Sequence, residues 1–131
     1  MFRADDYVKV TSLAEAYELC QKLSSLVVGG MVWLKMTNVT KRMVIDLSGL
    51  GLDQIEENEE EFSIGAMCSL RQLEIHEGLN TYFGGIFKEC TRHIVGVQMR
   101  NCATVGGSVY ARFGFSDILT CLLALDAYVA V

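Results

Sequence analysis

The chain has 131 residues, the length of one compact domain, and its 51% hydrophobic composition is ample for a buried core. The net charge is −5 and six acidic residues lie between Asp53 and Glu61, which argues against the concentrated basic face that nucleic-acid binding needs. No run approaches the ~20 apolar residues of a membrane helix, and residues 1–6 lack the apolar core of a signal peptide, so we expect a cytoplasmic protein without a membrane segment.

The N-terminal part predicts a helix followed by a strand that ends at two glycines. Ser12 to Glu15 has the form of a capping box, and apolar residues then recur at helical spacing, which predicts a helix from about Leu13 to Ser24. Leu26 to Val28 is a short apolar strand that ends at Gly29-Gly30, and Met31 to Met36 is typical of a short helical turn. This order of helix, strand, glycine turn and helix start is typical of half of a nucleotide site.

The middle of the chain predicts a second buried strand and a hairpin. Met43 to Leu47 is the strand, while Gln54 to Glu57 and Glu61 to Ile64 have the pattern of a hairpin with Asn58 near its turn. The acidic run then lies at a solvated hairpin tip. A hairpin beside buried strands predicts a mixed sheet.

Two helices are expected next. Ser69 to Gln72 is a second capping-box pattern that leads into a helix from Leu70 to His76. A further helix is expected from Leu79 to about Arg92, although Gly84-Gly85 inside it costs about 1 kcal/mol per glycine.

The C-terminal segment predicts a buried helix and a final strand. Ser116 is a suitable N-cap for the apolar run from Ile118 to Leu125. Asp126 to Val131 has the pattern of a strand, and the chain stops inside it, so we expect it to be part of a longer protein.

The cysteines do not predict a metal site. They are odd in number and widely spaced, and only two histidines accompany them, so reduced thiols are expected and an iron–sulfur cluster in this chain is not. They are Cys20, Cys68, Cys90, Cys102 and Cys121.

The two double-glycine segments, Gly29-Gly30 and Gly106-Gly107, are the best candidates for a ligand site. Each follows an apolar or β-branched stretch where we expect a strand to end, and glycine lets several main-chain N–H groups point at a phosphate. Thr104 and Ser108 add hydroxyl donors beside the second segment. Neither has the P-loop ending or the three spaced glycines of a dinucleotide fingerprint, so the residues fit tight corners as well as a phosphate cradle.

Other candidate residues are weaker. Asp117 can accept a hydrogen bond from a ligand hydroxyl, although complementing a helix dipole is favoured for it. Met31 and Trp33 can cover a ligand, although core packing is favoured. No catalytic triad, Cys/His pair or carboxylate pair stands out, so no catalytic residue is assigned, and any chemistry would come from a bound cofactor.

The run from Arg100 to Gly107, followed at suitable distances by Ser116-Asp117 and Leu125-Asp126-Ala127, resembles a known family. It is similar to the FAD-binding domain of the molybdenum hydroxylases, found in the flavoprotein (medium) subunit of enzymes of the xanthine dehydrogenase and carbon monoxide dehydrogenase type. The resemblance extends over essentially the whole chain. It implies an α/β (α+β) fold with a mixed sheet and flanking helices, with residues 1–131 forming the N-terminal portion of a PCMH-type FAD-binding domain.

The resemblance also implies a site. The two glycine segments would hold the FAD diphosphate, Asp117 would bond a hydroxyl of the ligand, and Ile94 would be an apolar neighbour. The implied cofactor-binding residues are Val28, Gly29, Gly30, Met31, Val32, Ile94, Thr104, Val105, Gly106, Gly107, Ser108 and Asp117. The family usually has Thr-Asp after the first glycine pair and Asn after the second. Here Met31-Val32 follows the first pair, which removes side-chain donors but leaves the main-chain amides, and Ser108 is a shorter substitute after the second pair.

As a function, the resemblance implies an oxidoreductase subunit. Electrons would pass from a molybdenum-pterin subunit through the clusters of an iron–sulfur subunit to the flavin, and then to NAD or another acceptor. Two alternatives stay open. One is a truncated or degenerate domain that serves as an assembly surface without flavin, and the other is a domain that binds a different dinucleotide or nucleotide.

Overall fold

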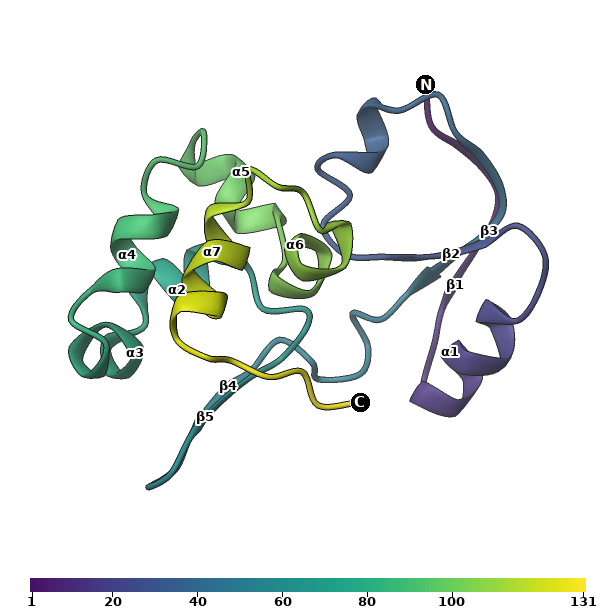
Figure 1. The fold of residues 1–131 in the computed structure, drawn as a ribbon. Helices are drawn as coiled ribbons and strands as arrows, with labels where there is room; N and C mark the ends of the chain where they lie inside the picture. Colours follow the sequence, from purple (N-terminus) through teal and green to yellow (C-terminus); the bar gives the residue numbers. More distant parts are fainter.

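A three-stranded parallel sheet forms the N-terminal part of the molecule in the computed structural model, which describes residues 1–131. Its strand order is β1 (Arg3–Lys9), β3 (Thr40–Asp46), β2 (Ser25–Val28). Helix α1 (Leu13–Cys20) packs on β2 and β3, and Figure 1 shows this part beside the helices that follow residue 69. The sheet and α1 enclose a small core of Val10, Ala16 and Ile45.

Strand β3 is the central strand, and its residues Val44 and Ile45 pair with both β1 and β2 and are buried. Their β-branched side chains favour the strand conformation. The expected strand at its C-terminal half and the strand β2 are confirmed. Strand β1 was not predicted from the sequence, since nearly all of its residues are exposed and only Val8 is half-buried. Helix α1 ends earlier than expected, at Cys20, and Ser24 adopts a positive φ of 64° before β2 begins.

The hairpin is confirmed. Strands β4 (Ile55–Glu57) and β5 (Phe62–Ile64) pair antiparallel, and the Asn58 side-chain oxygen accepts hydrogen bonds from the main-chain N–H groups of Glu60 and Glu61 at 2.8 and 2.9 Å. The tip of the hairpin projects away from the helices (Figure 1). Parallel and antiparallel pairing therefore both occur with flanking helices, but in two separate sheets.

The helical part begins with α2 (Leu70–Ile75), whose capping box is confirmed, because Ser69 and Gln72 bond each other's main-chain N–H groups. The single helix expected next is wrong: two helices, α3 (Glu77–Tyr82) and α4 (Ile86–Thr91), occupy that region. Gly84 and Gly85 separate them with φ angles of 61° and 80°, which an α-helix does not contain.

Three more helices complete the fold: α5 (Val97–Cys102) and α6 (Val105–Ala111), neither of which was predicted, and α7 (Asp117–Ala124). The N-cap expected for α7 is confirmed, since the Ser116 hydroxyl accepts a hydrogen bond from the Leu119 N–H at 3.3 Å. The main core is formed by α2, α3, α4, α6 and α7, with Cys68 from the segment before α2. Its members are Cys68, Leu70, Leu73, Leu79, Phe87, Val105, Ile118 and Cys121.

The strand expected at Asp126 to Val131 is wrong. The segment has no strand partner and follows α7 as an irregular, exposed segment after Asp126, whose φ is 54°. Its one side-chain hydrogen bond is made by the Tyr128 hydroxyl, which donates to the Glu61 carboxylate of the hairpin. None of the helices has the length and apolar character that crossing a membrane requires.

Candidate functional site

The two double-glycine segments meet, although they are far apart in the sequence. An ideal Cβ placed on Gly30 would lie 1.5 Å from the carbonyl oxygen of Cys102, and one on Gly29 would lie 2.4 Å from the Thr104 hydroxyl oxygen. Only glycine permits this approach of the end of β2 to the link between α5 and α6. Among the helices that follow residue 69, α6 lies on the side of the sheet in Figure 1. The glycine segments therefore join the two parts of the molecule.

The second segment is a helix start, which corrects the expectation that a strand precedes it. Helix α5 precedes it, and Gly106 and Gly107 lie in the first turn of α6. Thr104 is the N-cap, and its hydroxyl oxygen accepts a hydrogen bond from the Gly107 N–H at 3.1 Å. Gly106 packs on Ala66, whose Cβ would be 2.9 Å from a Cβ at this position. These two glycines are thus explained by capping and packing.

The main-chain donors of the second segment are already paired with protein acceptors. Val105 donates to the Cys68 carbonyl and Gly106 to the Ala66 carbonyl, both at 2.8 Å, while Ser108 donates to the Thr104 carbonyl at 3.0 Å. The Ser108 hydroxyl also bonds the Thr104 carbonyl, at 3.0 Å. This segment is a rigid support with few main-chain donors left for a ligand.

The main-chain donors of the first segment, in contrast, are not paired with protein acceptors. Every residue from Gly29 to Trp33 has a main-chain N–H group that donates to no protein acceptor. Gly29 through Val32 are half-buried, and Met31 adopts a left-handed φ of 56°, an uncommon conformation for a side chain of its size. Unpaired main-chain donors in a partly buried loop are costly unless water or a ligand accepts from them. Such a run of N–H groups in a turn is suited to bind an anion.

Val28, the first residue of the implied set, lies at the end of β2 with its side chain buried in the molecule. It therefore anchors the loop that follows.

An aromatic cluster lies against the first loop. The Trp33 ring contacts Phe113, which follows α6, with ring centroids 5.3 Å apart, and Phe113 stacks on Phe115 at 5.2 Å. Trp33 is 60% exposed, so the core packing favoured for it from the sequence is wrong. Phe113 and Phe115 were not singled out, and the only local signal was their alternation around Gly114.

Asp117 is not among the residues that meet at the glycine segments. It begins α7 and lines a shallow cavity between α4 and α7 with Cys90, Thr120 and Cys121, together with Ile86 and Ala124. No residue of either glycine segment lines that cavity. The Asp117 side chain makes no hydrogen bond or ion pair within the chain, so its carboxylate is a free acceptor.

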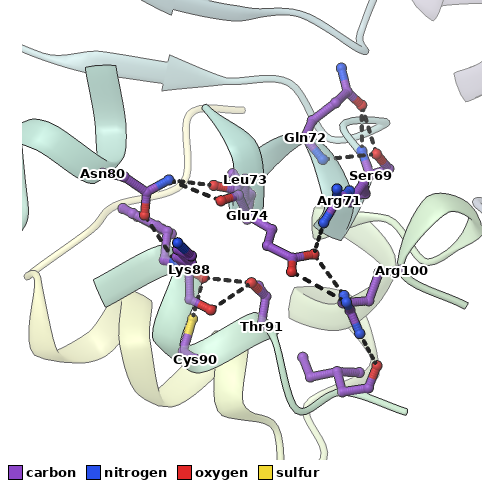
Figure 2. Close-up of polar contacts among 12 residues, drawn as sticks. Ser69, Arg71, Gln72, Leu73, Glu74, Asn80, Lys88, Cys90, Thr91 and Arg100 are labelled. Carbon is purple, nitrogen blue, oxygen red and sulfur yellow. Dashed lines mark hydrogen bonds and ion pairs between the residues drawn. The ribbon is translucent and has the colours of Figure 1, made fainter. Parts of the chain in front are cut away.

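Ile94 is held in place by Arg100, which forms a buried ion pair with Glu74; Figure 2 shows this pair. Its side chain packs on the main core, and its carbonyl oxygen accepts a hydrogen bond from Arg100 at 3.1 Å. The Arg100 Nε lies 2.7 Å from the Glu74 carboxylate, which also pairs with Arg71 at 2.9 Å. Burial raises the pKa of Glu74, but hydrogen bonds and charge from Arg100 and Arg71 outweigh it and hold the pKa below its ordinary value.

Known proteins resemble this chain over nearly all of its length. YgfM of Escherichia coli (strain K12) is 30% identical over 94% of this chain and 48% of its own length. The 6-hydroxypseudooxynicotine dehydrogenase complex subunit alpha of Paenarthrobacter nicotinovorans is 27% identical, over 95% of this chain and 44% of its own length. The chain thus spans about half the length of these relatives or less.

Solved structures have the same fold. A chain of carbon monoxide dehydrogenase from Hydrogenophaga pseudoflava matches with a TM-score of 0.72 and 24% identity, over 79% of this chain and 38% of its own. A chain of quinoline 2-oxidoreductase from Pseudomonas putida 86 matches with a TM-score of 0.68 and 21% identity, over 82% and 38%. The family model for the FAD-binding domain in molybdopterin dehydrogenases matches residues 1–131. The chain therefore belongs to the family of FAD-binding domains of molybdopterin dehydrogenases, and its cofactor is FAD.

Proposed function

We propose that the loop from Gly29 to Trp33 binds the diphosphate of FAD through its main-chain N–H groups. The observation that carries this proposal is the unbroken run of donors without protein acceptors in a partly buried loop. A diphosphate offers several anionic acceptor oxygens at once, so it can pair a run of this kind. The loss of the family's usual Thr-Asp side chains at Met31-Val32 leaves these donors intact.

The second glycine segment supports the first in this proposal. Thr104 is buried, and its hydroxyl oxygen lies against Gly29, so the α6 start fixes the position of the loop. Thr104 to Ser108 would line the diphosphate on the side of α6 mainly as a wall. The main-chain N–H groups of residues 105–108 have protein acceptors, so this segment would contribute less binding than the first loop.

Two basic side chains supply favourable charge near this site. Lys35 follows Trp33 by two residues, and Arg112 adjoins Phe113, which contacts Trp33. Neither forms an ion pair within the chain, unlike Arg71, Arg92 and Arg100. They would offset part of the negative charge of the diphosphate against a chain of net charge −5.

Ile94 and Asp117 would contact the rest of the cofactor. The free carboxylate of Asp117 would accept a hydrogen bond from a hydroxyl of FAD, and Ile94 would be an apolar neighbour. Bound FAD supplies the electron-transfer chemistry, while the residues of this chain bind and orient it. We propose that the domain works in a dehydrogenase of several subunits, and that the flavin receives electrons from the iron–sulfur clusters of a molybdenum-pterin enzyme and delivers them to NAD or another acceptor.

Binding of the purified protein to FAD, ADP and riboflavin tests the site. FAD is added to the protein, and the visible absorption spectrum of the bound flavin is recorded after gel filtration. ADP contains the diphosphate and should displace FAD, whereas riboflavin lacks it and should not. Absence of bound flavin and of FAD uptake would contradict the proposal and favour an assembly domain without cofactor. Displacement by riboflavin but not by ADP would contradict recognition of the diphosphate.

A substitution in each glycine segment separates their roles. Gly107→Val places a β-branched side chain beside Thr104 and should abolish FAD uptake if the α6 start lines the diphosphate closely. Met31→Gly removes the side chain at the left-handed position and keeps the N–H group, so FAD uptake should persist. Unchanged FAD affinity in Gly107→Val would place the diphosphate away from the second segment.

A further inference from the structure

The chain has one tryptophan, Trp33, and it ends the loop whose N–H groups lack protein acceptors. Its indole ring contacts the Phe113 ring at a tilt of 58°, and Phe113 is stacked on Phe115 with an interplanar angle of 9°. Trp33 is 60% exposed even so. The indole is therefore supported by Phe113 and leaves most of its surface open.

The contact between Trp33 and Phe113 joins the two segments that follow the glycine pairs. Trp33 follows Gly29-Gly30 on one side, and Phe113 follows α6, which contains Gly106-Gly107, on the other. A large aromatic side chain that is exposed but supported has a low entropic cost of ordering when a flat ligand stacks on it. The same loop carries the donors assigned above to the diphosphate.

We propose that Trp33 stacks on a planar ring of the cofactor and that Phe113 is a positioning residue for the indole. FAD has two such rings, adenine and isoalloxazine, on either side of its diphosphate, and both offer a flat aromatic face. This inference rests on the proposed function, because the diphosphate must be held by the loop that ends at Trp33. Stacking of a base on an aromatic side chain typically changes affinity by about 10-fold or more.

The affinities of Trp33→Ala and Trp33→Phe for FAD test the stacking. We expect Trp33→Ala to weaken FAD binding by about 10-fold and Trp33→Phe to lose much less, since phenylalanine keeps an aromatic face. Tyr17→Ala is the matched control, because Tyr17 is 68% exposed on α1 and contacts none of the aromatic rings of the cluster. It should bind FAD as the wild type does.

ADP and FMN identify the ring. If Trp33 stacks on adenine, Trp33→Ala weakens ADP binding, and ADP quenches the fluorescence of the wild type, whose emission at tryptophan wavelengths comes from Trp33 alone. If it stacks on isoalloxazine, the same variant weakens FMN binding and leaves ADP binding unchanged. Either result supports the proposal.

Phe113→Ala should weaken FAD binding in the same direction as Trp33→Ala, and the double variant should be no weaker than Trp33→Ala alone, because Phe113 acts through Trp33. Additive losses would show that Phe113 acts independently and would overturn its positioning role.

If Trp33→Ala binds FAD, ADP and FMN with the same affinity as the wild type, Trp33 does not stack on the cofactor. The proposed diphosphate site still stands if ADP displaces FAD from that variant. A dimer that Trp33→Ala converts to a monomer with unchanged FAD affinity would assign the aromatic cluster to a second copy of the chain and also overturn the proposal. Failure of the wild type to bind FAD or ADP overturns both.

Discussion

Replacing Gly30 by alanine tests the contact that joins the two parts of the molecule. The added Cβ would lie 1.5 Å from the Cys102 carbonyl oxygen, whereas real Cβ atoms essentially never come closer than 3.0 Å to such an atom. The end of β2 and the end of α5 must therefore separate by at least 3.0 − 1.5, or 1.5 Å. The obstructing atom belongs to the main chain, so no side-chain rotation relieves the overlap. We expect a loss at the upper end of overpacking costs, about 3 kcal/mol.

Urea unfolding measures this loss as a shift of the midpoint at constant slope. In a thermal scan, about 3 kcal/mol corresponds to a decrease in Tm of roughly 10 °C for a domain of this size. Gly114→Ala is the control, because a Cβ at Gly114 meets nothing within 4 Å, and it should cost no stability. Equal stability of Gly30→Ala and Gly114→Ala would refute the close contact between the two glycine segments.

Three further changes probe the supports of the site. Thr104→Ala should cost about 1 kcal/mol in urea unfolding, because it removes the N-cap acceptor for the Gly107 N–H, and Thr104→Ser should retain most of that stability; equal losses would argue against the cap. Glu74→Gln should cost about 3 kcal/mol, because it leaves Arg100 buried without its counter-charge. The pKa of Glu74 is lower in the folded protein, so the stability of the wild type should fall as the pH drops below about 5. The stability of Glu74→Gln should fall less steeply over the same range, and identical pH profiles for the two proteins would contradict the role of this carboxylate. Gly85→Ala should lower the free energy of unfolding by about 1 kcal/mol, because alanine is strained at the φ of 80° that Gly85 adopts. Wild-type stability of this variant would show that residue 85 does not adopt a positive φ.

Local signals predicted the elements whose ends are set by nearby side chains. The capping box at Ser69, the turn at Asn58 and the N-cap at Ser116 each form a hydrogen bond within three residues, so they are legible in the sequence. Strand β1 was missed because its partner, β3, lies more than thirty residues away and supplies its pairing. An exposed edge strand with adjacent aspartates carries little pattern of its own.

The candidate site also combines features that local sequence predicts with features that depend on long-range contacts. The glycine pairs pointed to a ligand loop, and the resemblance joined them into one FAD site. Which pair keeps its N–H groups unpaired depends on long-range acceptors, since Cys68 and Ala66 occupy the donors of the second pair. The support of Trp33 by Phe113 is also a tertiary contact without a sequence signal. The site therefore differs from the symmetrical two-turn cradle that the sequence suggested.

The amide signals of the loop test the central claim most directly. Nuclear magnetic resonance of the ¹⁵N-labelled protein follows each main-chain N–H as ADP and then FAD are added. We predict that the largest shifts with both ligands lie at residues 29–33, whose N–H groups have no protein acceptor, while the amides of Val105 and Gly106 change less because they keep their bonds to Cys68 and Ala66. If ADP and FAD bind and shift other amide signals while the signals of residues 29–33 do not move, the loop does not bind the diphosphate.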